Sequence, residues 1–132
     1  MTGKTRVGLR FLSGVPADAR RRVTRLVRAL RPYAKRPVTI TVVKNHAVSA
    51  INKPGVGFGV TIFAPKTDPR IIVCSGIIGA VMAAGESRSV GLEALGETLA
   101  HEWIHYEDWC AGRRLTEAGM ERRAGMLYRA AM

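Results

Sequence analysis

The stretch SVGLEALGETLAHEWIHYEDWCA, residues 89–111, has the periodicity of one long α-helix. Its large apolar residues recur at spacings of three and four, which is typical of a helix with one face packed in a core. Gly112 follows directly, and glycine commonly ends a helix. We therefore expect a helix from about Ser89 to Ala111 with a buried stripe of Leu92, Leu95, Leu99, Trp103, Tyr106 and Cys110.

Two histidines and a glutamate lie on another side of this helix. At about 100° per residue, His101 and His105 are separated by about 40° and share one face. Imidazoles one turn apart can both contact one ion at about 2.0–2.1 Å. Glu102 lies about 100° to the side, where it reaches a water on the ion more easily than the ion itself. This H-E-x-x-H spacing is typical of a zinc hydrolase.

A catalytic zinc usually has three protein ligands and one open position. The only other histidine, His46, lies far upstream. The metzincin pattern requires a glycine and a histidine further along the helix, where this chain has Asp108 and Ala111. A downstream carboxylate therefore remains as the third ligand, and the candidates are Asp108, Glu117 and Glu121.

A second helix is expected after a tight turn centred near Arg113, with Thr116 as its N-cap and the chain end as its limit. In an antiparallel helix hairpin, residues equidistant from the turn lie side by side. This places Glu121 beside His105 and Glu117 about one turn lower. We favour Glu121 as the third ligand, with Glu117 as the alternative.

The segment PADARRRVTRLVRALRPYA, residues 16–34, predicts an amphipathic helix that begins at Pro16 and ends near Pro32. Arginines occupy most positions outside its apolar face, which suits a solvated surface. The residues expected in the core are Val23, Leu26, Val27, Leu30 and Ala34.

Three strands are expected after this helix, over residues 38–44, 58–64 and 70–75. The first is rich in β-branched residues, the second alternates, and the third is largely apolar, as in a buried strand. A turn at Lys66–Pro69 predicts that the last two form a hairpin. The segment 76–89 fits either a short helix or a loop. The whole chain, 1–132, is then one α+β domain with an N-terminal helix, a small three-stranded mixed or antiparallel sheet, the histidine helix and a C-terminal helix.

The composition describes a basic globular protein. Hydrophobic residues make up 47% and charged residues 23%, and the net charge of +11 comes from 21 Lys and Arg against 10 Asp and Glu. Such a charge favours nucleic acid or acidic proteins as partners. Two cysteines are too few for a disulfide framework. The N-terminus lacks a secretory signal, and no apolar run reaches the roughly 20 residues that a membrane span needs, so we expect a cytoplasmic protein with no membrane partner.

The motif HEWIH, residues 101–105, followed by a glutamate in the next helix, resembles the gluzincin group of zinc metallopeptidases. The element ERRA, Glu121–Ala124, is similar to the E-x-x-A/S element that often carries the third ligand in that group. The length and order of elements are similar to minimal zincin domains such as the ImmA/IrrE-like metallopeptidases of phages and bacteria. A phage origin is compatible with that similarity.

The resemblance implies a zincin-like fold and one Zn²⁺ per chain. It also implies a metallopeptidase that hydrolyses peptide bonds in a protein substrate, with a zinc-bound water as nucleophile and Glu102 as general base. A second group usually stabilises the oxyanion in such enzymes, and the candidates here are Tyr106, Tyr128 and His46.

Two other functions are compatible with the sequence. One is a non-catalytic zinc domain that binds nucleic acid through the arginine-rich helix. The other is a structural phage protein that retains a zincin fold without turnover. The glutamate at position 102 favours the enzyme, because a structural zinc site has no use for it and tends to have four ligands.

Overall fold

The computed structural model describes residues 6–45, 48–49, 56–64 and 66–132. Within them the chain forms four α-helices and six strands, which confirms the α+β class. The elements are β1 (Val7–Phe11), α1 (Ala17–Leu30), a 3₁₀ turn η1 (Arg31–Tyr33), β2 (Val38–Val43), β3 (Val48–Ser49), β4 (Val56–Gly57), β5 (Gly59–Ile62), β6 (Arg70–Cys74), α2 (Ile77–Ala83), α3 (Arg88–Cys110) and α4 (Met120–Ala131).

The main sheet has four strands in the order β1-β2-β6-β5, and a separate two-stranded sheet pairs β3 with β4. β1, β2 and β6 run parallel, with Ile40 opposite Ile71 in the centre, while β5 runs antiparallel to β6. The predicted hairpin of the last two strands is thus confirmed, and the sheet is mixed. The predicted number of three strands is wrong because β1 adds a fourth. Its apolar residues Val7, Leu9 and Phe11 alternate with Gly8 and Arg10, which is a strand pattern.

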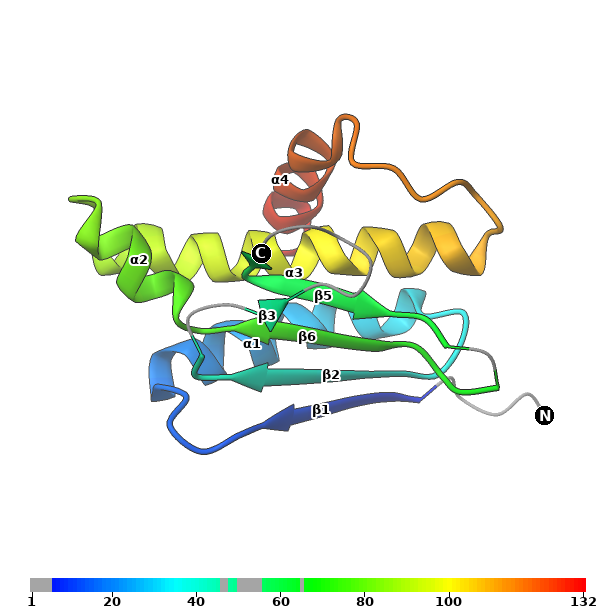
Figure 1. Ribbon diagram of the computed structural model, residues 1–132, viewed down its shortest axis with the longest axis horizontal. Helices are drawn as coiled ribbons and strands as arrows, with labels where there is room; N and C mark the ends of the chain where they lie inside the picture. The colour runs from blue at the N-terminus through cyan, green and yellow to red at the C-terminus, as the bar shows by residue number, and fades with distance from the viewer. Residues whose placement is uncertain (1–5, 46–47, 50–55, 65) are drawn as a thin grey trace.

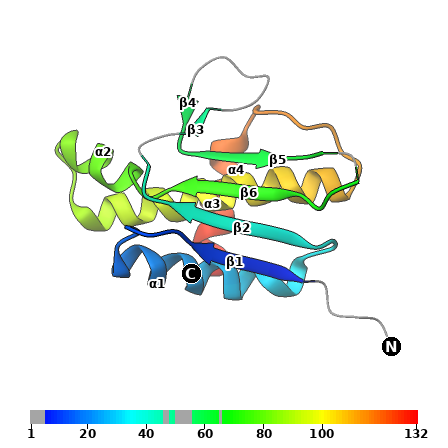
Figure 2. The same cartoon turned by 60° about the horizontal axis from the view of Figure 1, so that its bottom comes forward.

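The helices α1 and α3 lie on the same side of the sheet, and α4 lies across the outside of α3 (Figures 1 and 2). The core between sheet and helices is formed by inward-facing residues of the central strands, such as Ile40, Val42, Ile71 and Val73, none of which is exposed. α2 packs beside the N-terminal half of α3 (Figure 1). Helix α3 therefore has neighbours on most of its sides.

The predicted arginine-rich helix is confirmed as α1, with Pro16 as its N-cap residue. A 3₁₀ turn containing Pro32 follows its last residue, because proline cannot continue the hydrogen bonding of an α-helix. The five residues expected in the core are all buried: Val23, Leu26, Val27, Leu30 and Ala34.

The predicted histidine helix is confirmed as α3. Ser87 caps it by accepting a hydrogen bond from the N–H of Val90, and Gly112 follows its end with φ of 69°, a left-handed conformation that suits glycine. In the predicted stripe, four residues are buried, whereas Leu92 and Cys110 are only half-buried. Burial also extends beyond the stripe to Glu102, His105 and Asp108.

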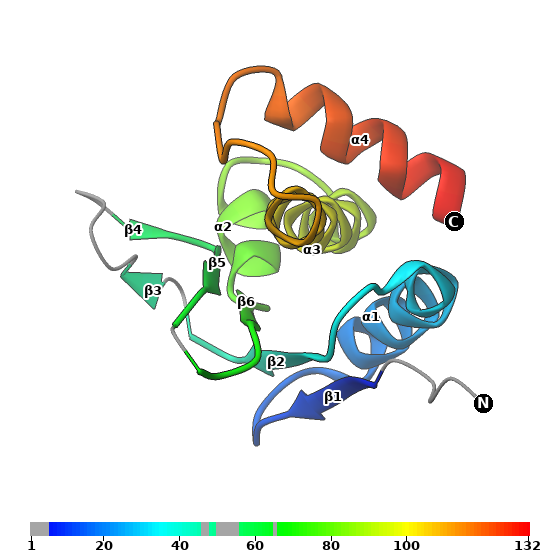
Figure 3. The ribbon, with the colours of Figure 1, turned by 90° about the vertical axis from the view of Figure 1, so that its right-hand side faces the viewer.

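The C-terminal helix differs from the prediction. It begins at Met120, after Gly119 in a left-handed conformation, and Thr116 instead accepts a hydrogen bond from the N–H of Ala118 within a loop. The connector between α3 and α4 therefore spans residues 111–119. Helix α4 crosses α3 instead of running antiparallel to it. Figure 3 shows this crossing with α3 seen end-on. The prediction of a tight helix hairpin centred near Arg113 is therefore wrong.

No helix in the described part of the chain combines the length and the apolar character that a membrane crossing needs.

Candidate metal centre

Two histidines of α3 and a glutamate of the connector converge on one point. His101 Nε2 and His105 Nε2 lie 3.2 Å apart. Glu117 places Oε2 3.0 Å from His101 Nε2 and Oε1 2.9 Å from His105 Nε2. One ligand atom from each residue fits in a group whose members all lie within 4.8 Å of one another. The fold thus brings together the predicted histidine pair and one of the two predicted glutamates.

This donor set fits a tetrahedral metal ion. Ligand atoms about 2.0–2.1 Å from a tetrahedral zinc lie about 3.3 Å from one another, close to the separation of the two Nε2 atoms. Two imidazole nitrogens and a carboxylate are also a ligand set found in catalytic zinc sites. The side chains of His105, His101 and Glu117 are 10, 24 and 51% exposed, so the group opens toward solvent on the side of the glutamate.

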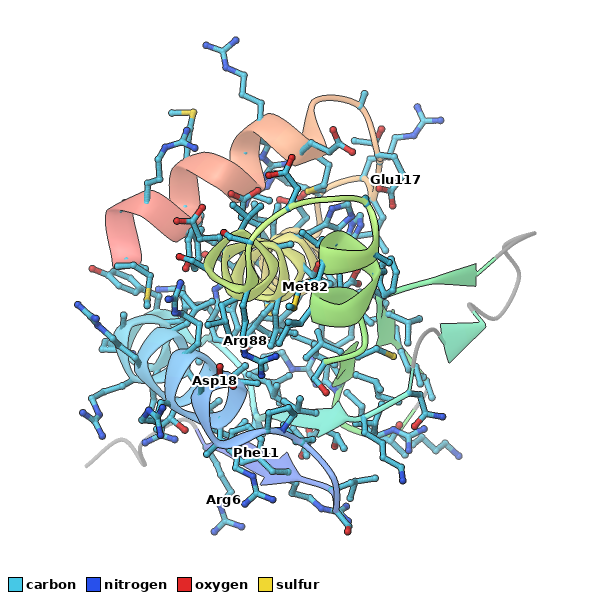
Figure 4. The ribbon with its side chains drawn as sticks, turned by 90° about the vertical axis from the view of Figure 1, so that its left-hand side faces the viewer. Arg6, Phe11, Asp18, Met82, Arg88 and Glu117 are labelled. Carbon is cyan, nitrogen blue, oxygen red and sulfur yellow. The ribbon has the colours of Figure 1, made fainter. Side chains whose placement is uncertain are left out.

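The preference for Glu121 as the third ligand is not supported by this geometry. Glu121 is exposed in the first turn of α4 and does not belong to the histidine group. The reason is the connector, because the chain returns to His105 before α4 begins and α4 then crosses α3. The alternative candidate, Glu117, is the carboxylate beside the histidines (Figure 4 shows its position).

The remaining candidate, Asp108, holds the connector instead of joining the group. Its carboxylate accepts two hydrogen bonds from Arg123 of α4, both 3.1 Å, and one from Arg113 Nε at 3.0 Å. Its side chain is 3% exposed. The hydrogen bonds from Arg123 are the main reason why the pKa of Asp108 lies below its usual value. Asp108 therefore ties both ends of the segment that carries Glu117 to α3.

Strand β5 supports the predicted general base, Glu102. The Thr61 hydroxyl lies 2.8 Å from Glu102 Oε1 and 3.1 Å from the Glu102 carbonyl oxygen. Gly59 allows the strand to approach α3 closely, because a Cβ there would lie 2.9 Å from Thr98 Cγ2 and 3.0 Å from Glu102 Cγ. The carboxylate is thus buried and oriented by the edge strand of the sheet.

The other end of β5 is also attached to α3. The ring of Phe63, just after the strand, stacks on Trp109 with 5.1 Å between centroids. The guanidinium of Arg36 lies over the same indole ring, 4.7 Å from its centroid. The contact of Phe63 with Trp109 keeps the end of β5 alongside the half of α3 that carries the histidines.

The structure gives no support to the proposed oxyanion stabilisers that it describes. The Tyr106 hydroxyl is buried and bonded to the backbone N–H and carbonyl of Arg36, and burial raises the pKa of Tyr106 to about 12. The Tyr128 hydroxyl accepts a hydrogen bond from Arg22 of α1. Both hydroxyls therefore connect elements of the core. His46, the third candidate, lies outside the described residues.

Sequence reasoning missed Thr61 and the Asp108–Arg123 pair. Thr61 lies in a predicted strand, but nothing local shows that its hydroxyl meets a residue 41 positions away. The partner of Asp108 depends on where α4 lies, which the hairpin assumption placed wrongly.

Comparisons with family models, with curated proteins and with solved structures find no match to this chain. Its function is therefore inferred from its own residues.

Proposed function

We propose that this protein is a zinc-dependent metallopeptidase that hydrolyses peptide bonds in a protein substrate. The observation that carries the proposal is the convergence of His101 Nε2, His105 Nε2 and the Glu117 carboxylate, with Glu102 next to the first ligand in the chain. Those three residues would hold the ion. A zinc ion bound there supplies Lewis acidity and lowers the pKa of water toward about 7.

Glu102 is the general base in this proposal. It accepts a proton from the attacking water and returns it to the leaving amine, as a positioned carboxylate can do. Its burial and the hydrogen bond from Thr61 limit its rotamers, so the carboxylate is already oriented before substrate arrives. Glu102 is not among the three grouped ligands, which leaves it available for this role.

A peptide substrate is supported by the position of β5. It is the last strand of the main sheet, and within the described residues no strand of that sheet pairs with its outer edge. An extended peptide can add to such an edge through main-chain hydrogen bonds. Thr61 and Gly59 lie against Glu102, so a peptide added to β5 would lie one strand away from the proposed base.

Metal analysis tests the ligand set. We expect one zinc per chain in the wild-type protein, loss of zinc in His101→Ala, and clearly weaker binding in Glu117→Gln. Glu121→Gln is the matched control and should bind zinc like the wild type. Full zinc retention by Glu117→Gln together with loss in Glu121→Gln would refute the assignment of Glu117.

Peptide cleavage tests the chemistry separately. Glu102→Gln should retain zinc but cleave a diverse peptide library at least about 100-fold more slowly, because general base catalysis typically contributes a factor of about 10²–10⁴. The yield of cleavage products, identified by mass spectrometry, should fall to a similar extent in His101→Ala. Unchanged cleavage by Glu102→Gln would exclude the proposed mechanism.

A further inference from the structure

Most of the basic residues lie outside the segment of the sequence that carries the candidate metal centre. Residues 86–121, which include α3 and the connector, contain eight acidic and three basic residues. The rest of the chain contains 18 basic residues and two acidic ones. The metal centre therefore lies in an acidic segment, and the net charge of +11 requires another explanation.

Helix α1 presents the densest group of these basic residues. Arg20, Arg21, Arg25 and Arg28 are exposed, while the apolar side of the helix is buried in the core. Arg21, Arg25 and Arg28 follow one another at spacings of four and three, so they form one stripe along the helix. With a rise of about 1.5 Å per residue, the stripe is about 10 Å long. We call these three residues the arginine stripe.

An open cleft of about 460 Å³ adjoins the stripe. It is lined by Asp18, Arg21, Arg22 and Arg25 of α1 and by Leu92 of α3. Its only acidic residue, Asp18, is bound by Arg88 of α3 through two hydrogen bonds of 2.6 and 2.8 Å (Figure 4 labels both residues). Because Asp18 is already paired, the cleft retains a positive charge from its three arginines.

Contacts inside the protein leave the arginines of the stripe largely available to an external ligand. Arg22 donates to the Tyr128 hydroxyl and Arg20 lies over the Phe11 ring, so these two are partly engaged. In the described part of the chain, neither Arg25 nor Arg28 is within ion-pair distance of a carboxylate. Guanidinium groups held on a rigid helix without an acidic partner suit an external anion.

We propose that the arginine stripe and the adjoining cleft bind the phosphate backbone of double-stranded nucleic acid, independently of base sequence. A duplex carries one charge per about 1.7 Å of its axis with both strands counted, so the length of duplex beside a stripe of about 10 Å carries about six phosphates, and the three arginines can contact those on the near side. Arginine forks pair well with phosphate oxygens. This surface is separate from the residues of the proposed peptidase site.

The residues of this surface favour a nucleic-acid duplex over a membrane or a single strand. The apolar residues of α1, such as Val23, Leu26 and Val27, are buried in the core, so the helix has no apolar face to insert into a membrane. Neither the stripe nor the cleft lining includes an aromatic residue on which unpaired bases could stack, as single-strand binding usually requires. The contacts that the surface can make are therefore those of its arginines with the phosphates of a duplex backbone.

Fluorescence anisotropy with a labelled 20-base-pair duplex tests the proposal on the full chain. We compare the wild type with a stripe variant, in which Arg21, Arg25 and Arg28 are each changed to Gln. The matched control changes exposed Arg6, Arg10 and Arg70 to Gln, so both variants lose the same charge. Thermal melting confirms that each variant is folded.

The stripe variant should bind the duplex at least about tenfold more weakly than the wild type, and its salt slope should fall by up to about three. The control should lose less than about threefold. His101→Ala should bind the duplex like the wild type, because the surface does not depend on the metal centre. Equal losses in both triple variants, or no measurable duplex binding, would overturn the proposal. Tighter binding to vesicles of anionic lipid than to the duplex would also overturn it, in favour of a membrane surface.

Discussion

At the scale of single residues, the surroundings of Glu102 give the strongest support for its proposed role as a general base. It follows the first histidine in the chain, it is 8% exposed, and the Thr61 hydroxyl lies 2.8 Å from one of its oxygens. A buried carboxylate with one oriented hydrogen-bond donor is restricted in rotation, which a general base requires. Thr61 is therefore a positioning residue if the proposed function holds.

Replacing Thr61 should affect turnover more than substrate binding. We expect Thr61→Val to lower kcat by about tenfold with little change in KM or in zinc content, because the carboxylate loses its oriented partner. Thr61→Ser should restore most of the activity, since it keeps the hydroxyl. Thr41→Val, at a half-buried threonine of β2, which β6 separates from β5, is the control. An equal loss of kcat in Thr61→Ser and Thr61→Val would contradict the role.

A second single-residue prediction concerns Gly96 of α3. A Cβ at this position would lie 2.1 Å from Cε1 of the buried Tyr128 ring, so an alanine displaces α4 or its tyrosine. We expect Gly96→Ala to destabilise the protein by about 1–3 kcal/mol. Gly79→Ala in α2 is the matched control, because nothing lies within 4 Å of its Cβ position. It should be neutral or stabilise by up to about 1 kcal/mol. Urea unfolding measures both, and similar values would be inconsistent with the close contact.

At the scale of elements, the connector decides which carboxylate reaches the histidines. It leaves α3 through Gly112, passes Glu117 beside His105, and enters α4 through Gly119. Asp108 holds this path by bonding Arg113 at its start and Arg123 in α4. The position of Glu117 therefore depends on contacts that lie outside the metal group.

The Asp108 contacts should appear as a pH-dependent stability. The pKa of Asp108 is lowered in the folded state, chiefly by hydrogen bonds from Arg123, so its contribution is complete above the ordinary pKa of 3.8 and is lost as pH falls through the lowered value. We expect Asp108→Asn to cost about 2–3 kcal/mol at pH 7 in metal-free protein. The difference from wild type should shrink below about pH 4.

Urea unfolding at pH 7 and at several pH values below 4 tests this expectation. Asp68→Asn, at an exposed aspartate, is the control and should change stability by less than about 0.5 kcal/mol. A destabilisation by Asp108→Asn that stays constant down to pH 2 would mean that the charge of Asp108 is not what holds the connector.

At the scale of the whole molecule, a metal ion would join α3 to the connector and so couple binding to folding. A ligand present at about 100 times its dissociation constant stabilises the folded state by about 2.7 kcal/mol. For a domain of this size, that corresponds to an increase in Tm of about 10 °C. We expect zinc to raise Tm in the wild type and in Glu121→Gln, but much less in Glu117→Gln. A zinc-dependent increase of the same size in His101→Ala would place the ion elsewhere.

Helices α1 and α3 could be predicted because their signals are local. The spacing of Leu95, Leu99 and Trp103 has the period of a helix. Pro16 and Gly112 mark helix ends because of their own backbone preferences. The pairing of His101 with His105 follows from that period as well. The three predicted strands were found for the same reason, since β-branched residues favour a pleated, half-buried surface.

The tertiary structure alone decided that β1 joins the main sheet beside β2, that α4 crosses α3, and that Glu117 rather than Glu121 lies beside the histidines. Parallel pairing of β1 with β2 joins residues about 30 positions apart, and the path of the connector depends on Asp108 meeting Arg123. Helical and strand periods are properties of neighbouring residues, so the sequence by itself determined which segments are helices and where the histidine pair lies. The third carboxylate depends on how two helices pack, and packing is a sum of contacts between residues that no local pattern connects.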